Sequence, residues 1–299
     1  MRILITGSSG FVGQHLCQYL ASIGDEVIAC PGPDGDGALD VTDEQAVRRR
    51  VSRAHPEGII HLAGVSSVAW SHANPAKTFL VNGLGTVNVL QAVREHAPAA
   101  RVLLVGSGEM YGRAPEGHRS REDDIPRPLS PYAASKLAGE EIARQYAASY
   151  GIQAVCARPF NHLGPGQAAN FVVPSFARQI AEVKRGKREP LIEVGDLSSV
   201  RDFLHVDDVI RGYRLLLESA EVGVPYNVCS GTGRTIRSLL DELLALAGVR
   251  AEIRTDPARL RPSEIPSLVG DPSRITSLGW QVVRPISLAL REVLSEYGA

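Results

Sequence analysis

Seven residues near the amino terminus decide the fold of this chain: Gly7-Ser8-Ser9-Gly10-Phe11-Val12-Gly13. They follow the short apolar run Arg2-Ile3-Leu4-Ile5-Thr6, which is typical of a buried strand. Over residues 11–23, apolar side chains recur at the spacing of a helix. The glycines therefore lie where a strand turns into a helix, and a glycine-rich loop in this context indicates dinucleotide binding.

Each glycine of this loop has its own physical use. Gly7 permits a tight turn, Gly10 lets the backbone approach a pyrophosphate, and Gly13 lets the helix lie close to the strand. Phe11 and Val12 begin the helix, whose free N–H groups and positive dipole end favour phosphates. The spacing G-x-x-G-x-x-G meets the G-x-G-x-x-G fingerprint only in part, and a glycine-rich turn without a ligand is the alternative.

Composition excludes several classes of protein. The chain has 299 residues, of which 44% are hydrophobic, and a net charge of −1, so it lacks the basic excess expected of a nucleic-acid-binding protein. No apolar run reaches the length of a membrane span, and a strand at residue 2 leaves no room for a signal peptide. Neither the histidines nor the acidic residues show metal-ligand spacing, so we expect no metal site. We expect a cytoplasmic protein with reduced thiols at its four scattered cysteines, Cys17, Cys30, Cys156 and Cys229.

Strand and helix patterns alternate as far as Arg158, which predicts an α/β fold with a Rossmann-type, doubly wound parallel sheet. Strands are expected at residues 26–30, 39–41, 58–62, 101–105 and 152–158, and helices at residues 75–96 and 130–150. Thr42 is expected to begin a helix after the strand at 39–41. We predict a dinucleotide-binding domain over residues 1–165, with later returns near 200–228. Residues 166–299 are expected to form mostly a smaller, mixed α/β substrate-binding lobe.

Acidic side chains follow the second predicted strand, where such folds bind the adenosine ribose. Asp34 and Asp36 lie in a Gly/Pro loop, and their charge would repel a 2′-phosphate, which favours NADH slightly over NADPH. Carboxylates in such loops are also ordinary turn chemistry, so both coenzymes stay open. Asp40, followed by Val41, is expected either to contact the adenine or to cap the turn.

The strand predicted from Gly58 onward runs into small residues, Leu62-Ala63-Gly64, which would let a cofactor lie across its carboxyl end. Ser66 follows in a loop and is expected to face the substrate. Ligands of parallel sheets bind at this edge, so cofactor and substrate are expected to meet there.

The residues suited to catalysis are Ser107, Tyr132 and Lys136. Tyr132 and Lys136 are four residues apart on a predicted helix, so they share a face. An ammonium group beside a phenol lowers its pKa, which would let Tyr132 exchange a proton with a substrate oxygen. Ser107, at the end of a predicted strand, is placed to hydrogen-bond the same oxygen.

Taken together, these motifs identify a resemblance to the extended short-chain dehydrogenase/reductase superfamily over the whole chain. They are residues 7–13, the run Ser107-Gly108-Glu109-Met110-Tyr111-Gly112, the Tyr132–Lys136 pair, and Arg158-Pro159-Phe160-Asn161. In that superfamily the matching Ser, Tyr and Lys are catalytic, and the Lys also holds the nicotinamide ribose. Members commonly dimerise through the two helices that match residues 75–96 and 130–150, which implies a homodimer here.

Narrower motifs resemble the GDP-4-dehydro-6-deoxy-D-mannose reductases, which form GDP-D-rhamnose. The motifs are residues 158–167 (RPFNHLGPGQ), 194–208 (VGDLSSVRDFLHVDD), 226–231 (YNVCSG) and 260–264 (LRPSE). The resemblance implies NADH- or NADPH-dependent reduction of a GDP-sugar at C4. It also implies substrate contacts at Asn161, Arg201, Arg261 and Glu264, with looser contacts at Val172 and Arg178. Ser66, Ser107 and Gly108 are further candidates for substrate binding. From the residues alone, Arg201 could instead pair with Asp202 or Asp208, and Glu264 could be a solvated loop acid.

Glu109 keeps a related reaction open, because it matches the catalytic acid/base of GDP-mannose 4,6-dehydratases. The loop at residues 7–13, in contrast, has the reductase and epimerase form rather than the GxxGQDG of those dehydratases. Other nucleotide-sugar epimerases or reductases remain alternatives, as does a non-catalytic dinucleotide sensor. Neither the C4 configuration of the product nor the choice of coenzyme follows from the sequence.

Overall fold

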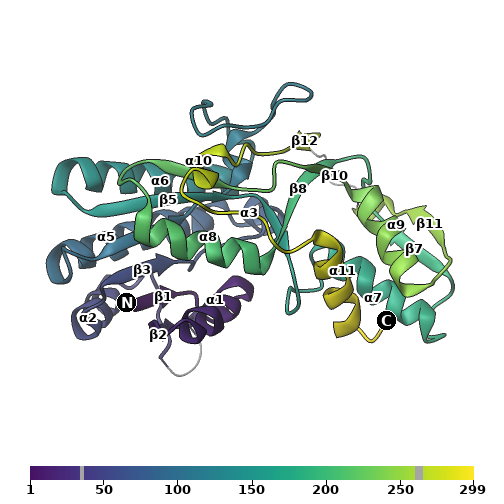
Figure 1. Cartoon of the computed structure of the whole chain (residues 1–299), viewed down its shortest axis with the longest axis horizontal. Helices are drawn as coiled ribbons and strands as arrows, with labels where there is room; N and C mark the ends of the chain where they lie inside the picture. The colour runs from purple at the N-terminus through teal and green to yellow at the C-terminus, as the bar shows by residue number, and fades with distance from the viewer. Residues whose placement is uncertain (34–36, 260–264) are drawn as a thin grey trace.

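A computed structural model describes residues 1–33, 37–259 and 265–299 of the chain. Its larger part is built on a six-stranded sheet with the order β2-β1-β3-β4-β5-β9 (Figure 1). Every neighbouring pair of strands in this sheet is parallel. The strands are β1 (Arg2–Thr6), β2 (Glu26–Cys30), β3 (Gly58–His61), β4 (Arg101–Val105), β5 (Gln153–Pro159) and β9 (Pro225–Val228).

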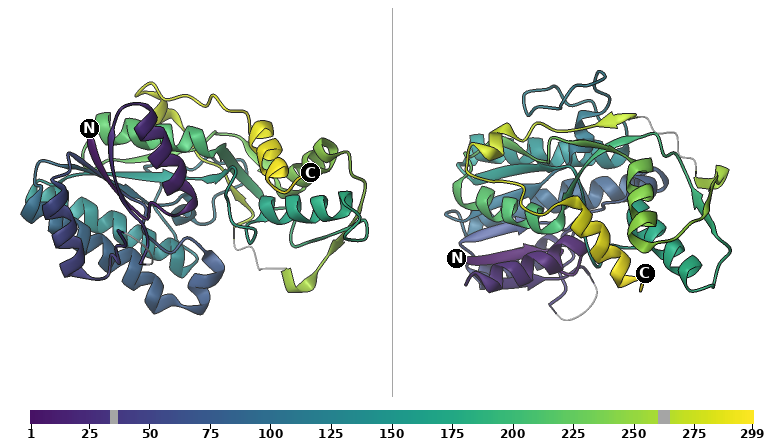
Figure 2. Two further views of the ribbon diagram at one scale, coloured as in Figure 1. Left: turned by 90° about the horizontal axis from the view of Figure 1, so that it is seen from below. Right: turned by 45° about the vertical axis from the view of Figure 1, so that its right-hand side comes forward.

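Helices cover both faces of this sheet, because successive strand residues point to opposite sides. Ile3 and Ile5 of β1 pack with Leu16 of α1 in one core cluster, whereas Leu4 packs in a second cluster with Val89 of α5. The predicted doubly wound parallel fold is therefore confirmed. One face carries α1 (Phe11–Ser22) and α8 (Val206–Ser219), and the other carries α2 (Glu44–Ala54), α5 (Gly85–His96) and α6 (Pro131–Tyr150) (Figure 2).

Local sequence signals set the ends of α6, the helix that carries Tyr132. Ser130 caps its start, since the Ser130 side chain accepts a hydrogen bond from the Ala133 N–H at 3.1 Å. Gly151 ends it with a φ of 69°, a left-handed conformation that glycine adopts readily. The predicted helix over 75–96 is also present, as α4 (Pro75–Phe79), a π-helical turn η1 (Leu80–Leu84) and α5.

Two expectations about residues 39–42 are wrong. Residues 39–41 form no strand, because the Leu39 N–H donates to the carbonyl of Pro31 and the chain folds back on its own loop. Asp43 rather than Thr42 caps α2, since its side chain accepts from the Ala46 N–H at 3.0 Å. In the described part of the chain, β2 is therefore an edge strand of the main sheet.

A smaller lobe lies past the carboxyl end of β5 (Figure 1). Its core cluster joins apolar residues of three helices, among them Phe176, Leu240 and Leu290. The chain returns from this lobe to the main sheet through α8 and β9, and then enters the lobe again. The lobe contains β6 (Asn161–Leu163), α7 (Val172–Lys184), β7 (Leu191–Val194), β8 (Val200–His205), β10 (Gly233–Thr235), α9 (Ile236–Ala247), β11 (Glu252–Thr255), β12 (Ser267–Leu268) and α11 (Ile286–Glu296).

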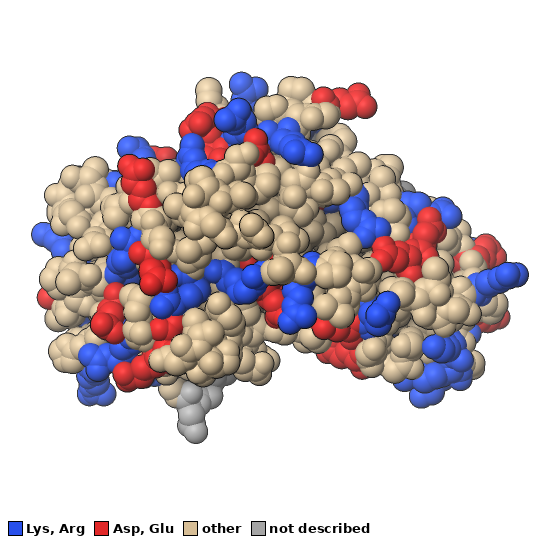
Figure 3. All heavy atoms as spheres, in the orientation of Figure 1, with Lys and Arg blue, Asp and Glu red and all other residues tan. Residues whose placement is uncertain are grey.

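On the face shown in Figure 3, acidic and basic side chains are scattered among larger uncharged areas, and neither sign of charge dominates. Within the described ranges, no helix combines the length and apolar character needed to cross a membrane. The same residues contain no group of three His, Cys, Asp or Glu side chains arranged to hold a metal ion.

Candidate active site

The glycine loop connects β1 to α1 at the carboxyl edge of the sheet. Gly7 has a φ of +71°, and a Cβ atom there would lie 2.7 Å from the backbone nitrogen of Ala63. A Cβ at Gly13 would lie 2.4 Å from the carbonyl oxygen of Gly7, so α1 rests directly on the loop. At Gly10 a Cβ would meet only that same oxygen, at 3.3 Å, so the space before Gly10 is open. The roles predicted for the three glycines agree with this packing.

Phe11 and Val12 form the first turn of α1, and no side chain caps that helix. Its first N–H groups have no partners within the helix and therefore suit an anionic ligand. The Phe11 ring lies beside His15, with ring centroids 5.4 Å apart, and stacks with His162 at 6.2 Å. The first turn of α1 thus packs against the start of the smaller lobe.

The adenosine end of the candidate cofactor site is described in part. Asp40 caps the local turn, because its Oδ1 atom accepts from the N–H and the hydroxyl of Thr42 at 2.9 and 2.7 Å. Val41 is 3% exposed and belongs to the core between sheet and helices. Asp34 and Asp36 lie outside the described residues.

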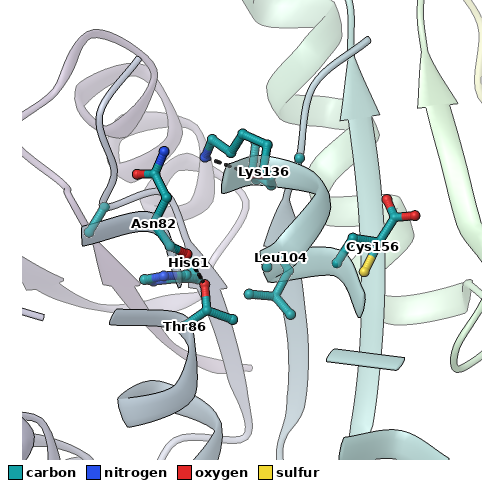
Figure 4. A pocket seen from close by; sticks show the side chains of 11 residues that line it. His61, Asn82, Thr86, Leu104, Lys136 and Cys156 are labelled. Atoms are coloured by element: carbon teal, nitrogen blue, oxygen red, sulfur yellow. Dashed lines mark hydrogen bonds between the residues drawn. The ribbon is translucent and has the colours of Figure 1, made fainter. Parts of the chain in front are cut away.

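Leu62-Ala63-Gly64 continues from the end of β3 past Thr6, whose hydroxyl accepts from the Ala63 N–H at 3.2 Å. A Cβ at Gly64 would lie 2.8 Å from Oδ1 of Asn82 and 3.3 Å from Nζ of Lys136. A small residue is therefore required at Gly64, where this segment passes α6. Figure 4 shows Lys136, Asn82 and His61 lining one small pocket at this point.

Asn82 is a site residue that the sequence analysis missed. Its Oδ1 accepts from the Val65 N–H at 2.8 Å, and its amide donates to the Ser135 hydroxyl at 2.8 Å. It thereby connects the loop after β3 to α6. Asn82-Gly83 interrupts an otherwise helical pattern, and this irregularity, here a π turn, is the signal that would have found it.

Ser107, Tyr132 and Lys136 lie together, as predicted. Ser107 follows β4 and begins the short 3₁₀ helix η2 (Gly108–Tyr111), and its side chain lies close enough to Tyr132, in the first turn of α6, to lower the pKa of that phenol. Lys136, one turn further along α6, donates from Nζ to the carbonyl of Val105 at 2.8 Å. A phenol, a hydroxyl and an amine therefore meet at the carboxyl edge of the sheet.

The expected lowering of the Tyr132 pKa by Lys136 is not found. Burial of Tyr132 raises its pKa, the hydrogen bond from Ser107 lowers it and the nearby Glu109 carboxylate raises it, to a net value of about 12. Burial also lowers the pKa of Lys136 to about 8. The pKa of Tyr132 is thus set mainly by desolvation, and the phenol holds its proton at neutral pH.

Glu109 follows the main sheet and Arg201 belongs to the smaller lobe, and the two side chains lie close enough for each charge to affect the pKa of the other. Burial raises the pKa of Glu109 while the charge of Arg201 lowers it. For Arg201, burial lowers the pKa, and Glu109 and Asp196 raise it. The two acids considered as partners of Arg201 are engaged elsewhere. Asp202 accepts from backbone N–H groups of the loop after β9, and Asp208 forms an ion pair within α8.

The other predicted substrate residues occupy different places around this edge. Asn161 lies on β6, in register with Phe203 of β8. Ser66 is exposed in the segment before α3 (Val68–Ala73). Gly108 packs closely, because a Cβ there would lie 3.0 Å from the ring of Phe160.

Val172 is the first residue of α7 and is 36% exposed. Arg178, six residues further along, is exposed, and its charge lies close to Tyr297. The described contacts therefore place Arg178 near the end of the chain rather than beside Ser107. Arg261 and Glu264 lie outside the described residues.

The comparison with protein families agrees with this site. The model of the NAD dependent epimerase/dehydratase family matches residues 3–229. The chain belongs to this family. The prediction of a nicotinamide-dependent oxidoreductase of the extended short-chain dehydrogenase/reductase superfamily is thereby confirmed.

Individual members of the family match along nearly the whole chain. GDP-6-deoxy-D-mannose reductase of Pseudomonas aeruginosa is 40% identical over 298 residues, which are 99% of this chain and 97% of that protein. GDP-6-deoxy-D-talose 4-dehydrogenase of Aggregatibacter actinomycetemcomitans is 32% identical over 282 residues, or 93% and 91% of the two chains. The structure of RMD from Pseudomonas aeruginosa complexed with NADPH superposes with a TM-score of 0.91 at 39% identity, covering 99% of this chain and 98% of that chain.

The described residues fit the coenzyme of the family. Gly10 leaves space for a pyrophosphate at an uncapped helix end. Gly64 packs closely against Asn82 and Lys136 at the same edge of the sheet. The glycine loop would hold the pyrophosphate, and Lys136 would hold the nicotinamide ribose.

Proposed function

We propose that the protein uses NADPH or NADH to reduce the C4 keto group of GDP-4-dehydro-6-deoxy-D-mannose, forming GDP-D-rhamnose. The observation that carries this proposal is the match with GDP-6-deoxy-D-mannose reductase, which covers 99% of the chain together with the Ser107, Tyr132 and Lys136 site. The smaller lobe, mostly residues 166–299, would bind the GDP-sugar, with Asn161 and Arg201 nearest the main sheet. Arginine suits a diphosphate, because its guanidinium pairs with two phosphate oxygens at once.

In the proposed mechanism the bound coenzyme supplies the hydride to C4. Tyr132 donates a proton to the carbonyl oxygen as negative charge develops on it. Its raised pKa suits a donor, because the phenol is protonated before the reaction. Ser107 hydrogen-bonds the same oxygen and stabilises the developing charge. Lys136 would hold the nicotinamide ribose, and its charge would assist the proton transfer.

Glu109 supports a second candidate, a GDP-mannose 4,6-dehydratase. Such a reaction needs an acid/base beside the tyrosine, and Glu109 is buried close enough to Tyr132 to raise its pKa. Burial raises the pKa of Glu109, which moves this carboxyl group toward the range suited to both accepting and donating a proton. The two reactions differ in their use of coenzyme, because a dehydratase regenerates its coenzyme and a reductase consumes it.

One assay separates these reactions. The purified protein is mixed with GDP-4-dehydro-6-deoxy-D-mannose and either NADPH or NADH, and the absorbance of reduced nicotinamide is followed. Stoichiometric loss of absorbance is expected, and the faster coenzyme resolves the choice between the two. NMR of the product assigns the C4 configuration as GDP-D-rhamnose or as the 6-deoxy-D-talose epimer. No loss, with a 4-keto product formed from GDP-mannose, would favour the dehydratase instead.

We also propose a cytoplasmic homodimer. Exposed apolar side chains on the segment that precedes α5, namely Phe79, Leu80 and Leu84, are 42–46% exposed and support an interface there. This segment packs beside α6, and the two would form a four-helix contact with a second copy. The four free cysteines suit a reducing compartment. Sedimentation of the purified protein measures the oligomeric state.

A further inference from the structure

One buried arginine connects the segments that carry the proposed catalytic side chains. Arg158 lies on β5 and is 4% exposed. Its guanidinium forms a fork with the carboxylate of Glu140 on α6, with Nη2–Oε1 and Nε–Oε2 distances of 2.5 and 3.0 Å. The remaining nitrogen, Nη1, donates to the hydroxyl of Tyr111 at 2.8 Å and to the backbone carbonyl of Glu122 at 3.1 Å. Such a fork holds both the separation and the orientation of its partners.

Glu140 links Arg158 to the helix of the proposed proton donor. Tyr132, Lys136 and Glu140 follow one another at four-residue spacing on α6, so they lie along one face of the helix. A slide or rotation of α6 against β5 would therefore move the phenol together with the carboxylate. The fork between Glu140 and Arg158 resists that movement.

Tyr111 links Arg158 to the other proposed catalytic segment. It is the last residue of η2, the turn that Ser107 begins and caps through a hydrogen bond from the Glu109 N–H at 3.2 Å. Burial raises the pKa of Tyr111, so its hydroxyl keeps a proton. It accepts from Arg158 and donates to Oδ1 of Asn227 on β9, at 2.6 Å. The turn that carries Ser107 is therefore held from two strands at once.

Stability alone does not account for this arrangement. Burying two charges costs solvation, and replacing such a pair by apolar residues of similar volume is often neutral or stabilising. What an ion pair adds over an apolar contact is a defined geometry. Between α6 and β5, that geometry sets the position of Tyr132 relative to Ser107.

We propose that Arg158 and Glu140 are positioning residues for the reduction, holding α6 and the Ser107 turn at the separation at which Ser107 and Tyr132 reach the same substrate oxygen. This inference rests on the proposed function of the site. Neither residue touches the substrate; both act through the segments that do.

Three variants test this role: Glu140→Gln, Arg158→Lys and the apolar double variant Glu140→Leu/Arg158→Met. The first two break the fork with little change in volume. We expect each to lower kcat about 10- to 100-fold with little change in KM or coenzyme affinity, because a displacement of about 1 Å at reacting groups costs about 100-fold. Glu141→Gln is the matched control, since it breaks the neighbouring ion pair between Glu141 and Arg144. These two side chains are 51% and 63% exposed, respectively. It should leave kcat unchanged.

The double variant separates positioning from stability. A thermal midpoint near that of the unaltered protein, together with a low kcat, supports the proposal. A double variant with full kcat would overturn it, as would single variants whose kcat falls only with the folded fraction. If the double variant does not fold, Glu140→Gln decides alone.

Failure of the proposed function would look different. The unaltered protein itself would then not oxidise NADPH with the keto sugar. In that case the same variants are compared in the dehydratase assay, because that reaction would use Ser107 and Tyr132 as well. A dehydratase rate that is unaffected by Glu140→Gln and by Arg158→Lys would also overturn the positioning role.

Discussion

Replacing Gly13 by Ala tests how closely α1 rests on the coenzyme loop. The new Cβ would lie 2.4 Å from the carbonyl oxygen of Gly7 and 2.7 Å from both Cα and the carbonyl oxygen of Ser8. All three are backbone atoms, so no side chain can turn aside and the helix itself must move. Such overpacking costs about 1–3 kcal/mol of unfolding free energy. The unfolding midpoint should fall by several degrees.

Gly10→Ala is the informative companion. Gly10 has a φ of −71°, and its new Cβ would meet only the Gly7 carbonyl oxygen, at 3.3 Å, so the fold should tolerate it. The methyl group would instead occupy the space assigned to the pyrophosphate and weaken coenzyme binding about 10-fold or more, by analogy with other overpacked sites. Gly83→Ala is the control, because no atom lies within 4 Å of its Cβ position.

Two measurements are needed for these three variants. Circular dichroism without coenzyme gives the unfolding midpoint, and nicotinamide fluorescence gives the dissociation constant of NADPH. Gly13→Ala should lower the midpoint and weaken NADPH binding, and Gly10→Ala should weaken binding alone. Gly83→Ala should lower neither the midpoint nor the affinity, because alanine favours the helix in which it lies. An unchanged midpoint for Gly13→Ala would refute the close packing of α1. Unchanged NADPH affinity for Gly10→Ala would refute the placement of the pyrophosphate.

Two further variants probe the chemistry and the pH dependence of stability. Tyr132→Phe should lower kcat about 10²- to 10⁴-fold by removing the proton donor, whereas Tyr150→Phe, at the exposed end of the same helix, should not; steady-state rates decide. Asp25 is buried, which raises its pKa, but its bonds to Arg214 and to the amino group of Met1 lower it below 3.8 overall. Its stabilisation is therefore present above pH 4 and is lost as pH falls through the lowered pKa, so Asp25→Asn should cost about 1–3 kcal/mol at pH 7 and progressively less on acidification. A cost that grows toward low pH in thermal unfolding would contradict this sign.

Much of the fold follows from interactions within a few residues of one another. The strand before Gly7, the helix after it and the ends of α6 at Ser130 and Gly151 depend on apolar spacing, capping and left-handed turns. The shared face of Tyr132 and Lys136 follows from helical periodicity alone. These features were predicted correctly because the local chain contains all the groups that determine them.

Short-range reasoning failed where tertiary contacts compete with it. Residues 39–41 have a strand-like pattern, yet the Leu39 N–H bonds to Pro31 instead of extending the sheet. The pKa of Tyr132 likewise depends mainly on desolvation by the surrounding elements. Neither the final hydrogen-bond partner nor the degree of burial is present in the residue pattern itself.

The sequence by itself therefore determined the family, the coenzyme loop and the trio of Ser107, Tyr132 and Lys136. Only the tertiary structure decided what holds that trio together. Arg158 and Glu140 are 18 residues apart, and the hydroxyl of Tyr111 reaches Asn227 across 116 residues. Such pairs form because α6 packs on β5 and because β9 pairs with β5. Which side chains become hydrogen-bond partners depends on how these elements pack, and the sequence of a single segment does not contain that information.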